Sequence, residues 1–296
     1  MNFTYLGTAA AEGWPAVFCN CPSCKRAEKI GLAAYWAGTK EAREIRTRSQ
    51  SLVGEDLLID LPPDTYLHKL RENLDLTKVK YLLITHKHMD HFYPQELTIR
   101  GSGYSHDMVN EDLHIYCAQE TMDYFYLVSG WELDKASDRH LHWHVLSAFQ
   151  PVQAGPYWIT PLPASHMKEG NEPFLYHIEK EEDGRNLSIL YLHDSGYYKD
   201  EVWDYFEKTA KDKGPVTMVS FDSTSGDKET DHGGHMGFSE VFRVKDRMEK
   251  LGIIGKETIC CMNHFSHNGH YSYDEMAALA SPHGCLVSYD GMKLAL

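Results

Sequence analysis

A short run of histidines and one aspartate constrains the fold of this chain more than any other feature. Residues 79–85 are apolar and short enough to form a buried strand, and four potential metal ligands follow directly: His86, His88, Asp90 and His91. Imidazole and carboxylate groups bind zinc, iron, nickel and manganese. The spacing lets His86 and His88 converge on one ion from an extended segment. Asp90 and His91 can then face a second ion, so we favour a pair of divalent metals over a histidine-rich surface turn.

A pair of metals needs more ligands than this run supplies. Three later apolar, strand-like segments end in a histidine or an aspartate, at His166, Asp194 and His264. Taken singly, each can be an ordinary residue at a strand end. Taken with the first run, they predict one shared site, in which Asp194 can bridge both ions.

The charge of the chain disfavours one class of function. It has 43 acidic and 29 basic residues, a formal net charge of −14 at pH 7. A nonspecific nucleic-acid binder needs a basic surface, so nucleic acid is disfavoured as a partner. No apolar run approaches the roughly 18 residues of a membrane-spanning helix. Residues 1–6 lack the basic start and apolar stretch of a signal peptide, so we expect a cytoplasmic protein without a membrane partner.

Short apolar runs alternate with longer amphipathic segments along the chain. We predict strands at 3–6, 56–60, 79–85, 113–117, 157–162, 175–178, 187–193, 216–221, 257–263 and 286–289. We predict helices at 25–36, 120–127, 201–213, 239–250 and 273–280. In the helix at 239–250, Ser239 is the expected cap. Strands dominate at first and alternate with helices later, which indicates a single layered α/β domain over residues 1–296.

The ligand spacing resembles that of the metallo-β-lactamase-fold hydrolases, whose signature is His-x-His-x-Asp-His followed by a later His, Asp and His. The resemblance covers essentially the whole chain. It implies a four-layer αββα sandwich, of α/β or α+β class, with the metals at one edge of the two sheets. It implies two ligand sets, His86, His88, His166 and Asp194 for one ion, and Asp90, His91, Asp194 and His264 for the other.

The family also has an aspartate at the end of an early strand, and Asp60 matches it. By resemblance, Asp60 would orient the metal-binding loop from behind the ligands. The family usually has a glycine soon after this aspartate. Here Leu61, Pro62 and Pro63 follow, so the geometry of the turn is open.

Three of the seven cysteines, Cys19, Cys21 and Cys24, lie within six positions. In a chain without a secretion signal, this pattern indicates reduced thiols and not a disulfide framework. Three thiolates in one loop need one more ligand to complete a tetrahedral structural zinc site. The alternative is three buried or idle thiols.

The cysteine loop and the preceding residues 7–15 resemble one subgroup of the superfamily, the phosphoribosyl 1,2-cyclic phosphate phosphodiesterases of the carbon–phosphorus lyase pathway. This resemblance implies that His267, three residues after His264, is the fourth ligand of a structural zinc. It also implies a homodimer. The pyrroloquinoline quinone biosynthesis protein B shares the cysteine loop and the fold, so the loop alone does not define the substrate.

The subgroup carries a further active-site histidine outside the metal ligands. The best match is His235 in a glycine-rich segment, and His232 is its rival; either can instead be an ordinary loop residue. Such a histidine can protonate a leaving oxygen or contact a phosphate oxygen. Asp222 ends a strand at the same edge, where it can support a neighbouring residue or contact the substrate.

Three weaker features remain. Alternating imidazoles occur at His140, His142 and His144, where a half-buried strand is favoured over another metal site. Arg46 and Arg48 can offer positive charge to a phosphate, although a solvated turn is the simpler interpretation. Residues 101–153 are expected to be an insertion, which can shape the substrate pocket or a dimer contact.

These features together predict a binuclear metal-dependent hydrolase with zinc, manganese, iron or nickel in the active site. The favoured activity is hydrolysis of a small cyclic or ribosyl phosphodiester by a metal-bridging hydroxide, with Asp90, Asp194 and His235 as the catalytic residues. One alternative is a thioester or lactone hydrolase of the same fold. Another is a noncatalytic carrier like the pyrroloquinoline quinone protein, which predicts an incomplete ligand set. All seven expected ligands are present in the sequence, which favours an enzyme.

Overall fold

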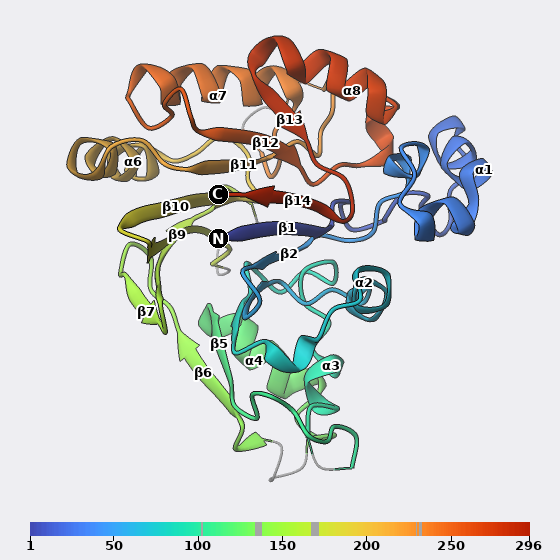
Figure 1. Ribbon diagram of the computed structural model, residues 1–296, viewed down its shortest axis with the longest axis vertical. Coiled ribbons are helices and arrows are strands. Elements are labelled where there is room, and N and C mark those ends of the chain that lie inside the picture. The colour runs from blue at the N-terminus through green and yellow to red at the C-terminus, as the bar shows by residue number, and fades with distance from the viewer. Residues whose placement is uncertain (102, 134–137, 167–171, 229, 231–232) are drawn as a thin grey trace.

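The chain folds into two seven-stranded β-sheets with helices on their outer sides (Figure 1). The computed structural model describes residues 1–101, 103–133, 138–166, 172–228, 230 and 233–296. In spatial order, the first sheet contains β14 (Met292–Ala295), β1 (Asn2–Gly7), β2 (Gln50–Val53), β3 (Leu57–Ile59), β4 (Tyr81–Leu83), β5 (Leu113–Cys117) and β6 (Leu141–Val145). The second contains β13 (Cys285–Val287), β12 (Ile259–Asn263), β11 (Met218–Asp222), β10 (Arg185–Leu192), β9 (Phe174–Glu182), β8 (Tyr157–Pro163) and β7 (Val152–Ala154).

Helices lie along the two outer faces of the sheet pair. The second sheet is covered by α6 (Asp200–Lys213), α7 (Phe238–Lys250) and α8 (Tyr273–Ala280). The first sheet is covered by α2 (Thr65–Glu72), α3 (Gln95–Thr98) and α4 (Gln119–Val128), while α1 (Pro22–Ala37) lies at one side (Figure 1). Among the described residues, four 3-10 turns connect these elements: η1 (Glu41–Glu44), η2 (Leu76–Lys78), η3 (His267–Gly269) and η4 (Ser281–His283).

The continuous apolar sequence of the short strands reflects burial on both faces. In β4, Tyr81 and Leu83 point into the core between the sheets, whereas Leu82 points into the core under the helices of the first sheet. This alternation follows from the two-residue repeat of a strand. A third core lies under α6, α7 and α8 and includes Val219 of β11 and Val241 of α7. Three apolar cores between four layers confirm the predicted αββα sandwich.

Strand direction places the ends of many strands at one edge. Strands β3 to β6 run parallel to one another in the first sheet, and β10 to β13 do so in the second. Strand β8 also shares the direction of β10, because each is antiparallel to β9. Side chains that follow the carboxyl ends of such strands collect at one edge, the usual place for a site in parallel sheets.

The predicted strands and helices correspond closely to the observed ones. The segments at 113–117 and 273–280 have the predicted bounds, and the others differ by a few residues at their ends. The prediction missed β2, β7 and β14, together with α2 and α3. These elements are short, and most of their residues are polar or lie where tertiary contacts decide the conformation.

The expectation that Ser239 caps α7 is wrong. The helix begins at Phe238, and Gly237 is the capping residue. The carboxylate of Glu240 accepts a hydrogen bond from the Gly237 N–H at 3.0 Å. An acidic side chain in the first turn therefore satisfies the buried Gly237 N–H, and a serine hydroxyl is not needed.

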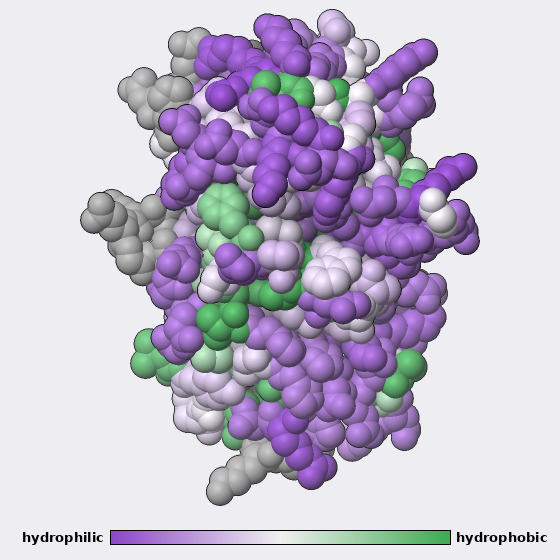
Figure 2. All heavy atoms as spheres, turned by 90° about the vertical axis from the view of Figure 1, so that its left-hand side faces the viewer, coloured by the Kyte–Doolittle hydropathy of each residue, from purple (hydrophilic) through white to green (hydrophobic). Residues whose placement is uncertain are grey.

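Residues 101–153 contain β5, α4 and β6, and they end at β7. That they are an insertion in a single domain stays a prediction. The segment 140–144 is a half-buried strand, as favoured, since β6 spans Leu141–Val145. Among the described residues, no group with metal-ligand spacing includes its histidines. Figure 2 shows a mainly hydrophilic face with small apolar patches, in keeping with a chain in which 24% of residues are charged. No helix among the described residues has the length and apolar character that crossing a membrane requires.

Candidate metal centre

The predicted ligands meet at the sheet edge where strand ends converge. The run from His86 to His91 follows β4, His166 follows β8, Asp194 follows β10 and His264 follows β12. These strands belong to both sheets, so the site joins the two halves of the sandwich. The structure brings all seven predicted ligands together in two adjoining groups that share Asp194.

The first group consists of His86, His88, His166 and Asp194, whose ligand atoms all lie within 4.8 Å of one another. The His88 Nδ1 atom lies 2.9 Å from His86 Nε2 and 3.1 Å from His166 Nε2. The Asp194 Oδ2 atom lies 3.7 Å from both of those Nε2 atoms. Ligands at about 2.0–2.1 Å around a tetrahedral zinc would be roughly 3.3 Å apart, so this group fits a divalent ion.

The second group consists of Asp90, His91, Asp194 and His264, all of them buried. The two histidines approach through Nε2 atoms that are 3.1 Å apart. The Asp194 carboxylate lies beside both, with Oδ2 3.2 Å from His91 Nε2 and Oδ1 3.0 Å from His264 Nε2. Asp90 Oδ2 lies 3.3 Å and 3.5 Å from the same two nitrogens. This spacing also fits a divalent ion.

The electrostatics of the second group favour a bound cation. Burial alone would lower the pKa of His91, but the carboxylates of Asp194, Asp90 and Asp60 raise it well above its usual value. Burial would likewise raise the pKa of Asp194, but His264 and His91 lower it well below its usual value. Buried carboxylates that converge on one point attract positive charge, and a divalent ion supplies it.

Asp60 holds His91 from behind, in the place that the resemblance implied. Its Oδ2 atom accepts a hydrogen bond from His91 Nδ1 at 2.7 Å, which leaves Nε2 free to bind a metal. Its Oδ1 atom accepts hydrogen bonds from the backbone N–H and the hydroxyl of Thr85, at 2.8 and 2.9 Å. The Asp60 carboxylate therefore fixes both the histidine ring and the start of the metal-binding loop.

The turn after Asp60 works without the family's usual glycine. Asp60 itself adopts the left-handed conformation, with φ of 65°. The next residue, Leu61, pairs with the metal-binding loop: its N–H donates to the His91 carbonyl at 2.7 Å, and its carbonyl accepts from Tyr93 N–H at 2.7 Å. The leucine backbone thus ties the turn to the ligand loop.

His166 is fixed by the glycine-rich segment that also carries His235. The Nδ1 atom of His166 donates to the Gly234 carbonyl at 2.8 Å, so its Nε2 atom faces the first group. His235 lies next to this histidine, with ring centroids 4.8 Å apart, and stacks on His264 at 5.6 Å. The structure therefore places His235 directly beside both groups. His232, the rival, lies outside the described residues.

Asp222 pairs with His235 and braces the neighbouring loops. Its Oδ2 atom accepts hydrogen bonds from His235 Nδ1 at 2.8 Å and from Ser195 N–H at 3.1 Å. Burial would lower the pKa of His235, but the Asp222 carboxylate raises it to about 9. Asp222 therefore favours the protonated form of His235, which can donate a proton from Nε2.

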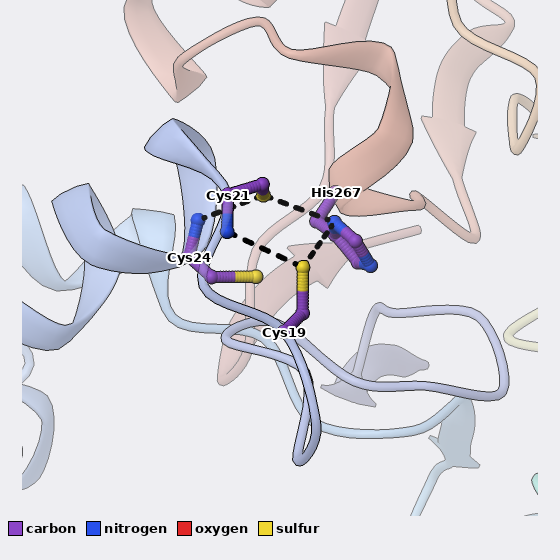
Figure 3. A group of neighbouring side chains, drawn as sticks. All are labelled: Cys19, Cys21, Cys24 and His267. Carbon is purple, nitrogen blue, oxygen red and sulfur yellow. Dashed lines mark hydrogen bonds between the residues drawn. The ribbon is translucent and has the colours of Figure 1, made fainter.

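A separate cluster forms around the cysteine loop (Figure 3). The ligand atoms of Cys19, Cys21, Cys24 and His267 lie within 4.8 Å of one another. His267 Nδ1 is 3.4 Å from Cys21 Sγ and 3.9 Å from Cys19 Sγ. A tetrahedral zinc with Zn–S near 2.3 Å would place these atoms roughly 3.6 Å apart, so the donor set fits zinc. Burial would raise the pKa of Cys21, but the Cys24 N–H and its neighbours lower it to about 6, which favours the thiolate.

The two arginines predicted as phosphate contacts both have partners within the protein. Arg46 is only 2% exposed, and its Nη1 atom donates to Thr8 Oγ1 and to the Ser288 carbonyl, so it cannot reach a substrate. Arg48 pairs with both carboxylate oxygens of Asp64. For Arg46, both the suggestion that it binds phosphate and the simpler interpretation as part of a solvated turn are wrong. For Arg48, the suggestion stays a prediction.

The prediction overlooked two threonines that contact metal-site residues. Thr85 lies directly before His86, and Thr224 lies two residues after Asp222; both hydroxyls hydrogen bond to ligand histidines. Hydroxyl side chains beside strand-end ligands were the available signal. The histidine partners of Thr85 lie one and six positions away, whereas Thr224 meets His264 across 40 positions. The second pairing depends on which strand ends meet, and that requires the fold.

Comparisons with known proteins agree with this geometry. The family model described as "Beta-lactamase superfamily domain" matches residues 56–255, more than half of the chain. No curated protein matches. Among solved structures, a diphosphatase from the PhnP family is similar with a TM-score of 0.70 at 20% identity, over 100% of this chain and 97% of that chain. The metallo-beta-lactamase fold protein YhfI from Bacillus subtilis has a TM-score of 0.65 at 19% identity, over 99% of this chain and 98% of that chain. Zinc-bound PqqB from Methylobacterium extorquens has a TM-score of 0.62 at 17% identity, over 100% of both chains.

Proposed function

The chain belongs to the beta-lactamase superfamily, and on that premise we propose that it is a binuclear metal-dependent phosphodiesterase acting on a small cyclic or ribosyl phosphodiester. One observation carries the proposal. The Asp194 carboxylate is shared by two four-residue ligand groups, and His235, whose protonated form Asp222 favours, lies against both. This arrangement suits the attack of water on a phosphorus centre and the departure of an alkoxide.

Two divalent ions bound here, zinc, manganese, iron or nickel, would activate water at neutral pH and neutralise charge on the phosphate oxygens. The first would be held by His86, His88, His166 and Asp194. The second would be held by Asp90, His91, Asp194 and His264. The mixture of imidazole and carboxylate donors accepts all four metals, so metal availability decides among them.

His235 would supply the proton that the leaving oxygen needs. Its Nδ1 atom is bound to Asp222, which fixes the ring and leaves the Nε2 proton available. Asp222 is nearly inaccessible to solvent, so it acts through His235 and not by touching the substrate. We therefore assign His235 as the proton donor and Asp222 as its positioning residue.

Two observations favour a phosphodiester over a thioester or lactone substrate. A protonated histidine beside the metal groups suits a leaving alkoxide, which is more basic than the thiolate of a thioester and so has a greater need for a proton. A similar structure is also named as a diphosphatase of the PhnP family. The similarity to PqqB keeps a noncatalytic carrier as a second candidate, because that protein is also of this fold.

Further parts of the proposal concern the rest of the molecule. We propose a structural zinc at Cys19, Cys21, Cys24 and His267. It would hold the N-terminal loop next to the segment that carries His264. A homodimer and a cytoplasmic location stay predictions.

The proposal is tested by hydrolysis of bis(p-nitrophenyl) phosphate with manganese- or zinc-loaded protein. We expect turnover that is abolished in Asp194→Ala and retained in Asp200→Ala, which removes an exposed carboxylate at the start of α6. Thioester and lactone substrates are assayed in parallel. Turnover of these substrates alone, or of none by folded and metal-loaded protein, would overturn the phosphodiesterase assignment.

A further inference from the structure

Thr224 makes two contacts with a single metal-site residue. It lies in the turn after β11, and its Oγ1 atom is 2.7 Å from the backbone carbonyl of His264 and 2.7 Å from Nδ1 of the same residue. The hydroxyl thus bridges the main chain and the ring of one histidine. Its own backbone N–H donates to Asp222 Oδ1 at 3.0 Å, which holds the threonine in place.

The direction of these two hydrogen bonds follows from proton counting. A hydroxyl has one proton, and a carbonyl oxygen can only accept, so Thr224 donates that proton to the His264 carbonyl. The contact with the ring must then run the other way, with Nδ1–H donating to the hydroxyl oxygen. A neutral imidazole carries one proton, so Nε2 of His264 keeps its lone pair.

That lone pair faces the second ligand group. The His264 Nε2 atom lies 3.0 Å from Asp194 Oδ1, 3.1 Å from His91 Nε2 and 3.5 Å from Asp90 Oδ2. His264 also adopts a left-handed backbone conformation, with φ of 61°, which is uncommon for a residue with a side chain. The bond from Thr224 to its carbonyl helps to hold this conformation at the end of β12.

We infer that Thr224 is a positioning residue for the ion held by Asp90, His91, Asp194 and His264. It selects the His264 tautomer that binds metal through Nε2 and orients the ring. The inference rests on the proposed metal centre. It predicts that loss of the hydroxyl weakens the binding of one active-site ion and leaves the affinity for the other unchanged. The reason is that His264 belongs to the second ligand group, which shares only Asp194 with the first.

The test compares metal binding by four forms of the full chain, in competition with a chelator and with metal content measured by mass spectrometry. Thr224→Val removes the hydroxyl at nearly constant volume, and Thr224→Ser keeps it. Ser223→Ala is the matched control. Ser223 directly precedes Thr224, and its hydroxyl is buried without a hydrogen-bond partner among the described residues.

We expect Thr224→Val to bind one active-site ion about 10–100-fold more weakly, the usual effect of removing a group that orients a ligand. The other active-site ion and the ion at the cysteine cluster should keep their affinities, as should all ions in Thr224→Ser and Ser223→Ala. Unchanged affinities in Thr224→Val, or an equal loss in Thr224→Ser, would overturn the inference. If the unaltered protein itself binds no pair of active-site ions, the proposed binuclear function is overturned. If it binds the pair and Thr224→Val does so equally well, only the role of Thr224 is overturned.

A second measurement does not depend on a variant that folds. In metal-free protein labelled with ¹⁵N in histidine, long-range nitrogen–proton correlation spectra report which ring nitrogen carries the proton. We expect the Nδ1–H tautomer for His264. The Nε2–H tautomer would contradict the inference.

Discussion

The Nδ1 atom of His91 lies 2.7 Å from Oδ2 of Asp60, although 31 positions separate the two residues in the chain. Both side chains are fully buried. One residue follows β3 and the other follows β4, and these strands are parallel neighbours in the first sheet. The sheet itself therefore brings the carboxylate behind the ligand and turns His91 Nε2 toward Asp194.

Replacing Asp60 with alanine should weaken binding of the ion that His91 contacts. We expect a loss of about 10–100-fold in affinity, because the histidine ring loses the partner that fixes its tautomer and orientation. Competition with a chelator measures this loss. Asp56→Ala is the control, since Asp56 lies at the opposite end of β3 from Asp60 and its carboxylate accepts from the Tyr157 hydroxyl. Equal affinities in Asp60→Ala and the unaltered protein would contradict this account.

The pH dependence of hydrolysis should report the Asp222–His235 pair. The active form of a proton donor is protonated, so the rate falls as pH rises through the pKa of His235, which Asp222 raises to about 9. In Asp222→Asn that carboxylate charge is gone, and the basic limb of the kcat/KM profile should move down by one or more units, toward the usual histidine value of about 6.5. Asp227→Asn, in the same loop, should leave the limb in place. A limb that does not move in Asp222→Asn would exclude His235 as the titrating donor.

The cysteine cluster should hold its zinc independently of the active site. Cys21→Ser should release one zinc per chain and lower the melting temperature, because the loop from Cys19 to Cys24 loses its link to His267. Colorimetric zinc release and thermal unfolding measure the two effects. Cys117→Ala, which alters a buried thiol of β5, should keep the full zinc content. Full zinc content in Cys21→Ser would show that this cluster is not a zinc site.

Arg46 should matter to stability and not to substrate binding. Its guanidinium is buried and is linked to the buried Asp290 carboxylate through the Thr8 hydroxyl, which accepts from Arg46 and donates to Asp290. Arg46→Met removes the donor to the Thr8 hydroxyl and the Ser288 carbonyl and one of the cations near Asp290, so we expect a loss of about 1–3 kcal/mol in unfolding free energy by denaturant titration. Adding Asp290→Asn should recover part of it. A loss below about 1 kcal/mol, or a raised KM at unchanged stability, would contradict this assignment.

Much of the fold was predictable because the strands are short apolar runs separated by turns. The ligand run from His86 to His91 predicted the metal site, since these residue types at this spacing rarely occur at a strand end without binding a metal. The ends of three later strand-like segments supplied the partners His166, Asp194 and His264, and the resemblance then assigned them to two ligand sets. These residues follow the carboxyl ends of strands, and the observed strand order brings those ends together at one edge of the two sheets.

The remaining features required the structure. From the sequence, Arg46 is expected at the surface. In the structure its guanidinium packs against the Phe265 ring in the interior. The start of α7 depends on Glu240, which replaces the expected serine hydroxyl. Thr224 meets His264 only because β11 and β12 are neighbours, and no local pattern in the sequence records that pairing.

The central claim is that Asp194 joins two metal ions in one site, and the metal content of Asp194→Ala tests it most directly. The unaltered protein, loaded and freed of loosely bound metal, should hold two ions beyond the one at the cysteine cluster. Asp194→Ala, folded and still holding the cysteine-bound zinc, should lose both, because each group loses a ligand and the bridge between them. Retention of both ions in that variant would contradict the account.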